Sequence, residues 1–281
     1  MFALLAFGSW GIVPLFWRLL AGVPPIEVLA HRVAWSLVVA TLLLVVMGGG
    51  KEAFATLRSP RRAALFFLSS ALIAGNWGLF IWAVAVNRLS EASLGYFINP
   101  LANVVLGVAV LGERLRPAQW LAVGLAAGAV LLLLVSGGGV PWVALALAGS
   151  FAVYGLIRKL APLGSIPGLF LETLLLSPVA IAAIGWFERQ GGILGRGDPL
   201  LIGLAAASGV VTSLPLVWFT VAARELPLST MGLFQYVAPS LQLLLAVLVF
   251  GEHVAPVRWA AFALIWVALV IHSAVLARRR G

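Results

Sequence analysis

One stretch of this 281-residue chain occurs twice, and the repeat limits what the chain can fold into. The first copy covers residues 88–120 and the second covers residues 225–259. Each copy holds a Leu, a Gly, a Pro and a Glu in matched order: Leu89, Gly95, Pro100 and Glu113, then Leu226, Gly232, Pro239 and Glu252. Both copies lie in strongly apolar sequence, where an internal repeat is typical of membrane transporters built from two related halves.

The composition also indicates a membrane protein. Hydrophobic residues make up 63% of the chain and charged residues 10%, against about a quarter charged in soluble domains. The sequence predicts an all-α integral membrane protein, because its long runs are apolar on every side rather than alternating as in a β-barrel. A large soluble helical core is the disfavoured alternative. Ten transmembrane helices are expected, over residues 2–20, 27–47, 61–86, 91–111, 116–135, 141–157, 166–186, 199–223, 228–250 and 256–276.

Ten helices and one repeat imply two halves of five. An odd number of spans turns the second half upside down relative to the first, which predicts inverted repeats about an axis in the membrane plane. We expect the first five-helix repeat at 1–136 and the second at 137–281, with Gly137 to Gly139 as the linker.

Lys and Arg set the expected orientation, because they gather on the cytoplasmic side of membrane proteins. With both termini in the cytoplasm of a bacterium, twelve fall inside: Lys51, Arg58, Arg61, Arg62, Arg114, Arg116, Arg158, Lys159, Arg224 and Arg278 to Arg280. Five fall outside the inner membrane: Arg18, Arg88, Arg189, Arg196 and Arg258. The net charge of +9 is then explained by topology and lipid contact, without a nucleic-acid partner. No cleavable signal peptide is expected, because Met1 opens the first span without a basic segment before it.

The paired prolines indicate where a substrate site lies. Pro100 and Pro239 each remove one backbone hydrogen bond from matched spans, and matched interruptions in two halves point to a central site with gating kinks. The alternative is a kink needed only for packing. We expect a substrate-binding cavity lined by polar and aromatic residues near these kinks: Trp10, Asn76, Trp77, Tyr96, Asn99, Tyr154, Gln235 and Tyr236. Other tryptophans, Trp142 among them, are expected at the membrane interfaces.

Four ionisable residues within the spans are candidates for charge pairing. Glu27 and His31 are four residues apart on one helix face, with interfacial anchoring as the alternative. Arg32 and Glu172 occupy broadly matching places in the two halves, so a pair across the halves is a weaker hypothesis. Glu113 and Glu252 are expected to brace loops or to gate.

Several features exclude other classes of function. The chain has no Cys, no phosphate-binding loop, and no metal-ligand or catalytic cluster at membrane depth, so we expect no cofactor, no metal and no enzyme activity. Gly124 to Gly128 is interpreted as a close-packing helix face.

Four stretches carry a family resemblance: residues 75–84, 91–100, 112–115 and 228–236. With the Gly-Glu repeat, they resemble the EamA repeat of the drug/metabolite transporter superfamily, and most of all its RarD-like branch. The resemblance implies ten helices, inverted halves, a central cavity and export of small molecules such as amino acids, drugs or other metabolites.

The favoured function is therefore an amino-acid exporter that alternates access across the membrane. Efflux of drugs or other metabolites is the alternative within that class. A channel, and a membrane enzyme or scaffold, are the rivals outside it. Proton coupling, uniport and exchange stay open, and a monomer is sufficient for each.

Overall fold

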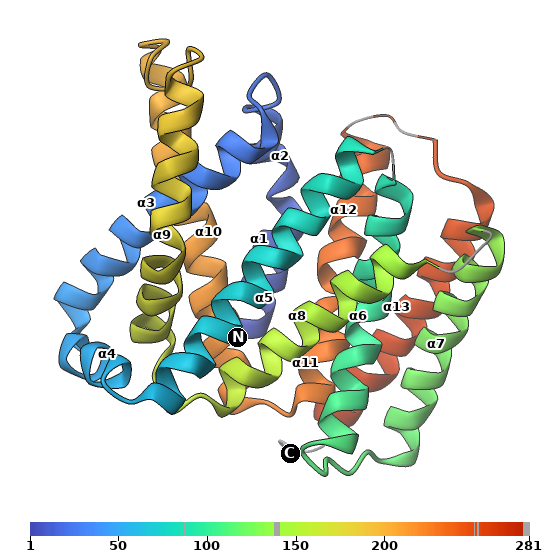
Figure 1. Ribbon diagram of the computed structural model, residues 1–281. Helices are drawn as coiled ribbons and strands as arrows, with labels where there is room; N and C mark the ends of the chain where they lie inside the picture. The colour runs from blue at the N-terminus through green and yellow to red at the C-terminus, as the bar shows by residue number, and fades with distance from the viewer. Residues whose placement is uncertain (87, 138–140, 250, 252, 278–281) are drawn as a thin grey trace.

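The computed structural model describes residues 1–86, 88–137, 141–249, 251 and 253–277 of the chain, and over these residues it is all helix and loop. The helices, drawn in Figure 1, are α1 (Phe2–Ile12), α2 (Pro14–Arg18), α3 (Pro25–Met47), α4 (Gly50–Leu57), α5 (Pro60–Ala85), α6 (Leu89–Ala109), α7 (Pro117–Gly137), α8 (Trp142–Leu160), α9 (Ser165–Glu188), α10 (Pro199–Glu225), α11 (Leu228–Gln235), α12 (Val237–Leu248) and α13 (Pro256–Ala277).

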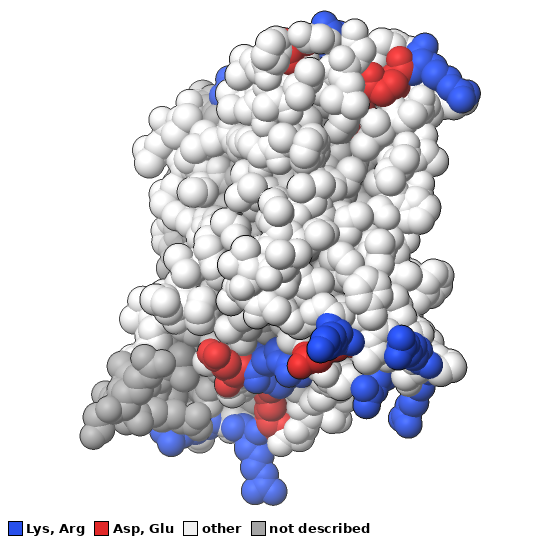
Figure 2. Space-filling model, turned by 90° about the vertical axis from the view of Figure 1, so that its left-hand side faces the viewer, with Lys and Arg blue, Asp and Glu red and all other residues white. Residues whose placement is uncertain are grey.

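The predicted all-α membrane fold is confirmed. Within the described residues, nine helical stretches are long and apolar enough to cross a membrane, and a shorter apolar stretch covers Phe2–Arg18. Figure 2 shows charged side chains at two ends of the molecule and a broad uncharged band between them. Pro14 divides the first span into α1 and α2, because proline has no N–H to continue the helix ladder.

The two repeat prolines have different local structures. The ninth span ends its first helix at Gln235 and resumes at Val237. Pro239 lies four residues after Gln235 and provides no N–H for its carbonyl, which accounts for the break. By contrast, α6 runs through Pro100 as one helix. The expected matched interruption is therefore present only in the second copy in this conformation, and gating by the prolines stays a prediction.

Helix packing joins the two parts of the chain throughout. α3 packs on α9 and α10, α6 on α8 and α11, α1 on α10 and α12, α5 on α8 and α9, and α7 on α13. The five spans counted from residue 1 have counterparts in the five spans counted from residue 141. When each helix in these pairs is replaced by its counterpart, the same set of packed pairs results. In Figure 1, α3 and α9 stand at one side of the molecule and α7 and α13 at the other, with the remaining spans between them.

The repeat glycines permit close helix contacts. A side chain added at Gly232 would begin 2.4 Å from the carbonyl oxygen of Pro100, and one at Gly95 would begin 3.2 Å from that of Ala144. Gly124 is different, since nothing lies within 4 Å of the corresponding position there, and the same holds for Gly128. The interpretation of residues 124–128 as a closely packed face is therefore wrong.

The Glu of the first copy caps a helix that follows in the second. The Glu113 carboxylate accepts hydrogen bonds from the backbone N–H groups of Leu228 and Ser229, the latter at 2.9 Å, and from the Ser229 hydroxyl at 2.6 Å. The first N–H groups of a helix have no partner within it, and a negative charge there is favoured by the helix dipole. Gly107 leaves the space for this carboxylate. Glu252, its counterpart, lies outside the described residues.

We predict that Gly232→Ala destabilises the protein by about 1–3 kcal/mol, because the new methyl group meets a backbone oxygen that cannot rotate away. Gly124→Ala is the matched control, since its methyl group meets no neighbour and alanine favours helix. Thermal unfolding in detergent should show a lower midpoint for the first variant and an unchanged or higher one for the second. Equal midpoints would contradict the close contact between α6 and α11.

Candidate functional site

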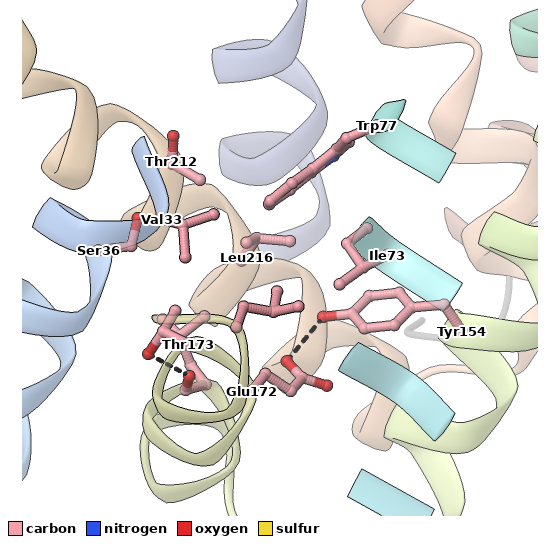
Figure 3. A pocket seen from close by; sticks show the side chains of 11 residues that line it. Val33, Ser36, Ile73, Trp77, Tyr154, Glu172, Thr173, Thr212 and Leu216 are labelled. Atoms are coloured by element: carbon pink, nitrogen blue, oxygen red, sulfur yellow. Dashed lines mark hydrogen bonds between the residues drawn. The ribbon is translucent and has the colours of Figure 1, made fainter. Parts of the chain in front are cut away.

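A narrow cavity lies where α3, α5, α8, α9 and α10 meet. In this conformation the side chains close it to about 10 Å³, which is room for about one water molecule. Figure 3 shows Trp77 and Thr212 toward one end and Glu172 and Tyr154 toward the other. The lining is mostly apolar with a few hydroxyl groups and one carboxylate: Val33, Ser36, Ile73, Trp77, Tyr154, Leu169, Glu172, Thr173, Leu176, Thr212 and Leu216. Such a lining is typical of small-molecule sites.

Glu172 is the charged residue of the cavity wall, and its carboxylate is fully engaged. Ser69 donates to Oε1 at 2.6 Å and the Tyr154 hydroxyl donates to Oε2 at 3.2 Å. Arg158 Nε lies 3.7 Å from Oε1, and the two charged side chains are only 1% and 3% exposed. A buried charge needs this kind of pairing, because the membrane interior provides no water to solvate it.

Arg158 is held by more than its partner acid. Its Nε also approaches the Thr220 hydroxyl at 3.4 Å, Nη2 donates to the Ser165 carbonyl at 3.1 Å, and the guanidinium lies 5.6 Å from the centre of the Phe66 ring. Gly168 makes room for it, since a side chain there would begin 2.1 Å from Nη1. The guanidinium is therefore built into the bundle.

Arg158 was expected in a loop, and this expectation is wrong, because the residue lies in the last turn of α8 and is buried. The span was expected to end at 157, whereas α8 continues to Leu160. The extra turn directs Arg158 inward, while Lys159 donates instead to the carbonyls of Ala223 and Leu226. Gly168 leaves the space for Arg158, but the sequence alone does not show that this glycine faces the guanidinium.

Arg32 does not pair with Glu172, so that hypothesis is also wrong. Its Nε donates to the Thr212 hydroxyl at 3.1 Å. The guanidinium lies 4.6 Å from the ring centre of Trp17 and 4.8 Å from that of Trp77, which are cation–π distances. Glu172 has Arg158 as its nearer partner, which leaves Arg32 beside the Trp77 and Thr212 end of the cavity.

Glu27 and His31 lie near each other, and together with Glu188 they form a cluster of three ionisable side chains. One oxygen of Glu27 accepts from the Ile193 N–H at 2.6 Å, and Glu188 accepts from the N–H groups of Leu194 and Gly195. Ligand atoms of the three side chains lie within 4.8 Å of one another, close enough to hold a metal ion, and His31 Nε2 has no hydrogen-bond partner. The carboxylates already brace the loop after α9, so we interpret the cluster as a loop anchor.

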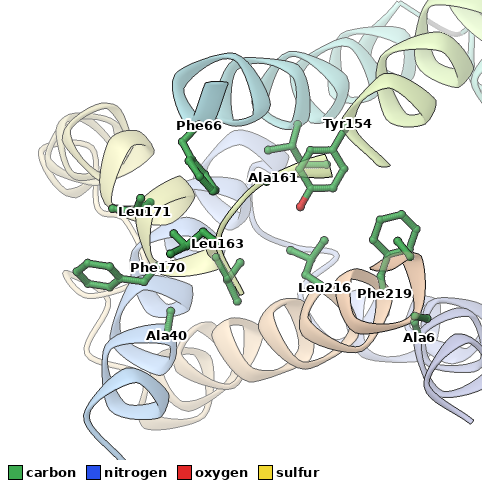
Figure 4. Packing of buried hydrophobic residues seen from close by; sticks show 14 of the residues in the cluster. Ala6, Ala40, Phe66, Tyr154, Ala161, Leu163, Phe170, Leu171, Leu216 and Phe219 are labelled. Carbon is green, nitrogen blue, oxygen red and sulfur yellow. The ribbon is translucent and has the colours of Figure 1, made fainter. Parts of the chain in front are cut away.

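Trp10 and Tyr154 belong to one aromatic cluster behind the cavity. Tyr154 stacks on Phe219 with ring centres 6.3 Å apart, and Trp10 lies 5.6 Å from Phe219 and 5.8 Å from Phe151. Figure 4 shows Tyr154 and Phe219 in the main buried cluster. Tyr154 thus presents its hydroxyl end to the cavity, while Trp10 supports it from behind.

The expected polar residues mainly connect helices. Asn76 donates to the Leu147 carbonyl at 2.8 Å and to the Ser150 hydroxyl at 2.9 Å. Asn103 donates to Gln235 at 2.9 Å, and its contact with Asn99 is longer, at 3.4 Å. These side chains are not among those that line the cavity in this conformation.

The two expected tyrosines of the repeat differ in setting. Tyr236 is fully buried among α6, α7 and α13, where its hydroxyl donates to the Phe97 carbonyl. Tyr96 is 43% exposed and lies against Phe80. Of the eight residues expected to bind substrate, the structure places Trp77 and Tyr154 on the cavity, and binding itself stays a prediction.

Comparison with known proteins gives the family. The profile described as the EamA-like transporter family matches residues 1–135. Protein RarD of Streptomyces exfoliatus is 49% identical over 270 residues, covering 95% of this chain and 85% of that protein. Protein RarD of Escherichia coli K12 is 44% identical over 283 residues, covering 100% and 96%. The chloramphenicol-sensitive protein RarD of Pseudomonas aeruginosa is 33% identical over 280 residues, covering 96% of this chain and 92% of that protein.

The chain therefore belongs to the EamA-like transporter family of the drug/metabolite transporter superfamily, in its RarD-like branch. A solved crystal structure with 21% sequence identity superposes with a TM-score of 0.76, over 99% of this chain and 96% of that one. That likeness concerns the fold alone. The family makes the chain a multi-pass membrane transporter.

We predict that Arg158→Leu destabilises the protein by about 3–5 kcal/mol, because Glu172 is left charged and unpaired in the bundle. The double variant Arg158→Leu/Glu172→Leu should recover a large part of that loss, since it removes both charges. Thermal unfolding of the two single variants and the double variant forms a double-mutant cycle. Additive losses would contradict the pairing.

Proposed function

We propose that the protein is a secondary carrier of the bacterial inner membrane that exports small molecules, with aromatic and other neutral amino acids as the favoured substrates. The observation that carries the proposal is the cavity of Figure 3, built by helices from both parts of the chain. A carrier needs a site that both halves touch, because rocking one half against the other then changes the side from which the site is reached.

The lining supports an amphipathic substrate. Trp77 and Tyr154 provide aromatic surface, and Ser36, Thr173 and Thr212 provide hydroxyl groups on an otherwise apolar wall. Aromatic rings bind apolar bodies over a large area, while a few polar groups fix their orientation. Neutral amino acids with large side chains have this combination of groups.

We infer that 1–136 and 137–281 are inverted five-helix repeats with both termini in the cytoplasm. The exchange symmetry of the helix pairs supports the repeats. The charges of the short loops support the orientation, with Arg158 now removed from the count. Residues 278–281, which include three of the basic residues in that count, lie outside the described part of the chain.

The Glu113 cap suggests how one end of the cavity closes. Glu113 joins the loop after α6 to the start of α11, and Lys159 and Arg224 hold neighbouring loop carbonyls at α8 and α10. The Glu113 contact joins the first half to the second, so it must separate if the halves rock apart at that end, whereas the Lys159 and Arg224 contacts lie within the second half. We infer that the cap is a latch on the cytoplasmic side and that it opens during transport.

Efflux of drug-like molecules is the second candidate. A relative that shares 33% identity carries the name chloramphenicol-sensitive protein, and a mostly apolar cavity with hydroxyl groups also suits a neutral aromatic drug. Uptake assays in proteoliposomes with labelled phenylalanine, tryptophan, threonine and chloramphenicol decide between the two. Transport of none of them would contradict the proposed function.

We predict that Trp77→Ala lowers the transport rate in proteoliposomes about tenfold or more, because the ring lines the cavity and stacks on Arg32. Trp142→Ala is the matched control, since that ring is 45% exposed at the start of α8. Its transport rate should stay within about twofold of wild type. Equal losses in the two variants would show that Trp77 acts only through stability.

We predict that Glu113→Ala opens the latch. A single cysteine at Thr230, which is 2% exposed beside the cap, should then react several-fold faster with a water-soluble maleimide than in the Glu113 background. The chain has no native cysteine, so the signal is specific. Glu52→Ala on the exposed face of α4 is the control. An unchanged labelling rate in Glu113→Ala would contradict the latch.

A further inference from the structure

Arg32 is a cation within a membrane span that has aromatic partners and no acidic one among the residues the structure describes. Arg158 in the same bundle is paired with Glu172. An unpaired charge at membrane depth is costly and usually marks a substrate or ion pathway. The question is which group completes the surroundings of Arg32.

The contacts of Arg32 fix its guanidinium and leave its outer edge available. Trp17 of α2 and Trp77 of α5 lie 4.6 and 4.8 Å from it, and Thr212 of α10 accepts from Nε at 3.1 Å. Neither Nη nitrogen is a buried atom without a partner, so both reach accessible space. The two Nη groups form the planar fork that matches a carboxylate with two parallel hydrogen bonds.

The position of this fork connects it to the cavity. Trp77 and Thr212, which hold Arg32, are themselves cavity-lining residues (Figure 3). Arg32 itself is not a lining residue, but a molecule that widened the cavity during transport would bring a terminal group to Trp77 and Thr212, the residues that hold the fork. The other end of the cavity holds Glu172, whose carboxylate is already occupied by Ser69, Tyr154 and Arg158.

We propose that Arg32 binds the carboxylate of the transported molecule, so that the substrates are amphipathic carboxylates, zwitterionic amino acids included. This inference rests on the proposed carrier function and narrows it. The competing explanation is a structural one, in which Arg32 only joins α2, α3, α5 and α10 through its tryptophans and Thr212. The two explanations differ in one measurable respect, since only the first predicts that the protein distinguishes an acid from its amide.

The test measures binding to the purified full-length protein in detergent by isothermal titration calorimetry. The probes are two acid–amide pairs: phenylalanine with phenylalaninamide, and N-acetyltryptophan with N-acetyltryptophanamide. The second pair has no amine, so it separates the carboxylate from the effect of a positive charge. The variants are Arg32→Gln, Arg32→Lys and the control Arg258→Gln, which removes an exposed cation at the start of α13.

We expect wild type to bind each acid about tenfold or more tightly than its amide, because the hydrogen bonds to Arg32 are charge-assisted. Arg32→Gln should abolish this preference, Arg32→Lys should keep part of it, and Arg258→Gln should leave it unchanged. Loss of preference with amide binding retained also excludes misfolding as the cause. If Arg32→Gln folds too poorly to measure, Arg32→Lys tests the same ratio.

Three results would overturn the proposal: equal binding of acids and amides by wild type, an undiminished preference in Arg32→Gln, or no binding of any carboxylate. Tighter binding of phenyl phosphate than of phenylacetate would overturn the carboxylate assignment in favour of a phosphate. The carrier function fails separately. Wild type that binds the acids but moves none of them in proteoliposomes would contradict transport and support the role of Arg32.

Discussion

The absence of water in the hydrocarbon core requires each polar group in the spans to find its partner inside the bundle or in a wet cavity. The helix pairs of this protein are organised around that requirement. Asn76 ties α5 to α8, Asn103 ties α6 to α11, and the Arg158–Glu172 pair ties α8 to α9. The Asn76 and Asn103 bonds connect helices far apart in the sequence, and the Asn76 bond and the Arg158–Glu172 pair fix α5, α8 and α9, which form part of the cavity wall.

The repeat could be recognised in the sequence because residues of the same type recur at matched spacing in both copies. Some of these residue types have a physical cause that the structure shows. Gly232 is small because it meets the Pro100 carbonyl, and Glu113 is acidic because it caps α11. The spans were also predictable, since apolar length alone defines them. What a residue contacts was much harder to infer. Asn76, for example, was expected on the cavity and is instead used between two helices.

The wrong predictions mainly concern charged residues, because a difference of a few residues in helix length decides whether such a side chain lies in a loop or inside the bundle. Because α8 is three residues longer than expected, Arg158 lies in its last turn and is buried, rather than in a loop. In this position Arg158 pairs with Glu172, so Glu172 does not need Arg32 as a partner. Trp77 and Tyr154 line the cavity of this structure, whereas Trp10 and Tyr236, expected with them, pack in buried clusters, and substrate binding by any of them stays a prediction.

Arg158 and Arg32 have the same side chain but different partners, and they therefore have different effects on the charge near the cavity. Arg158 is 1% exposed and its charge is balanced by Glu172, so it adds no net attraction for an anion in the cavity. Arg32 is half-buried and faces two indole rings, which stabilise a cation without neutralising it. Among the described residues, Arg32 therefore has no acidic partner beside Trp77. A substrate that carries a negative group at one end of an apolar body would complete the charge balance that the protein itself leaves open.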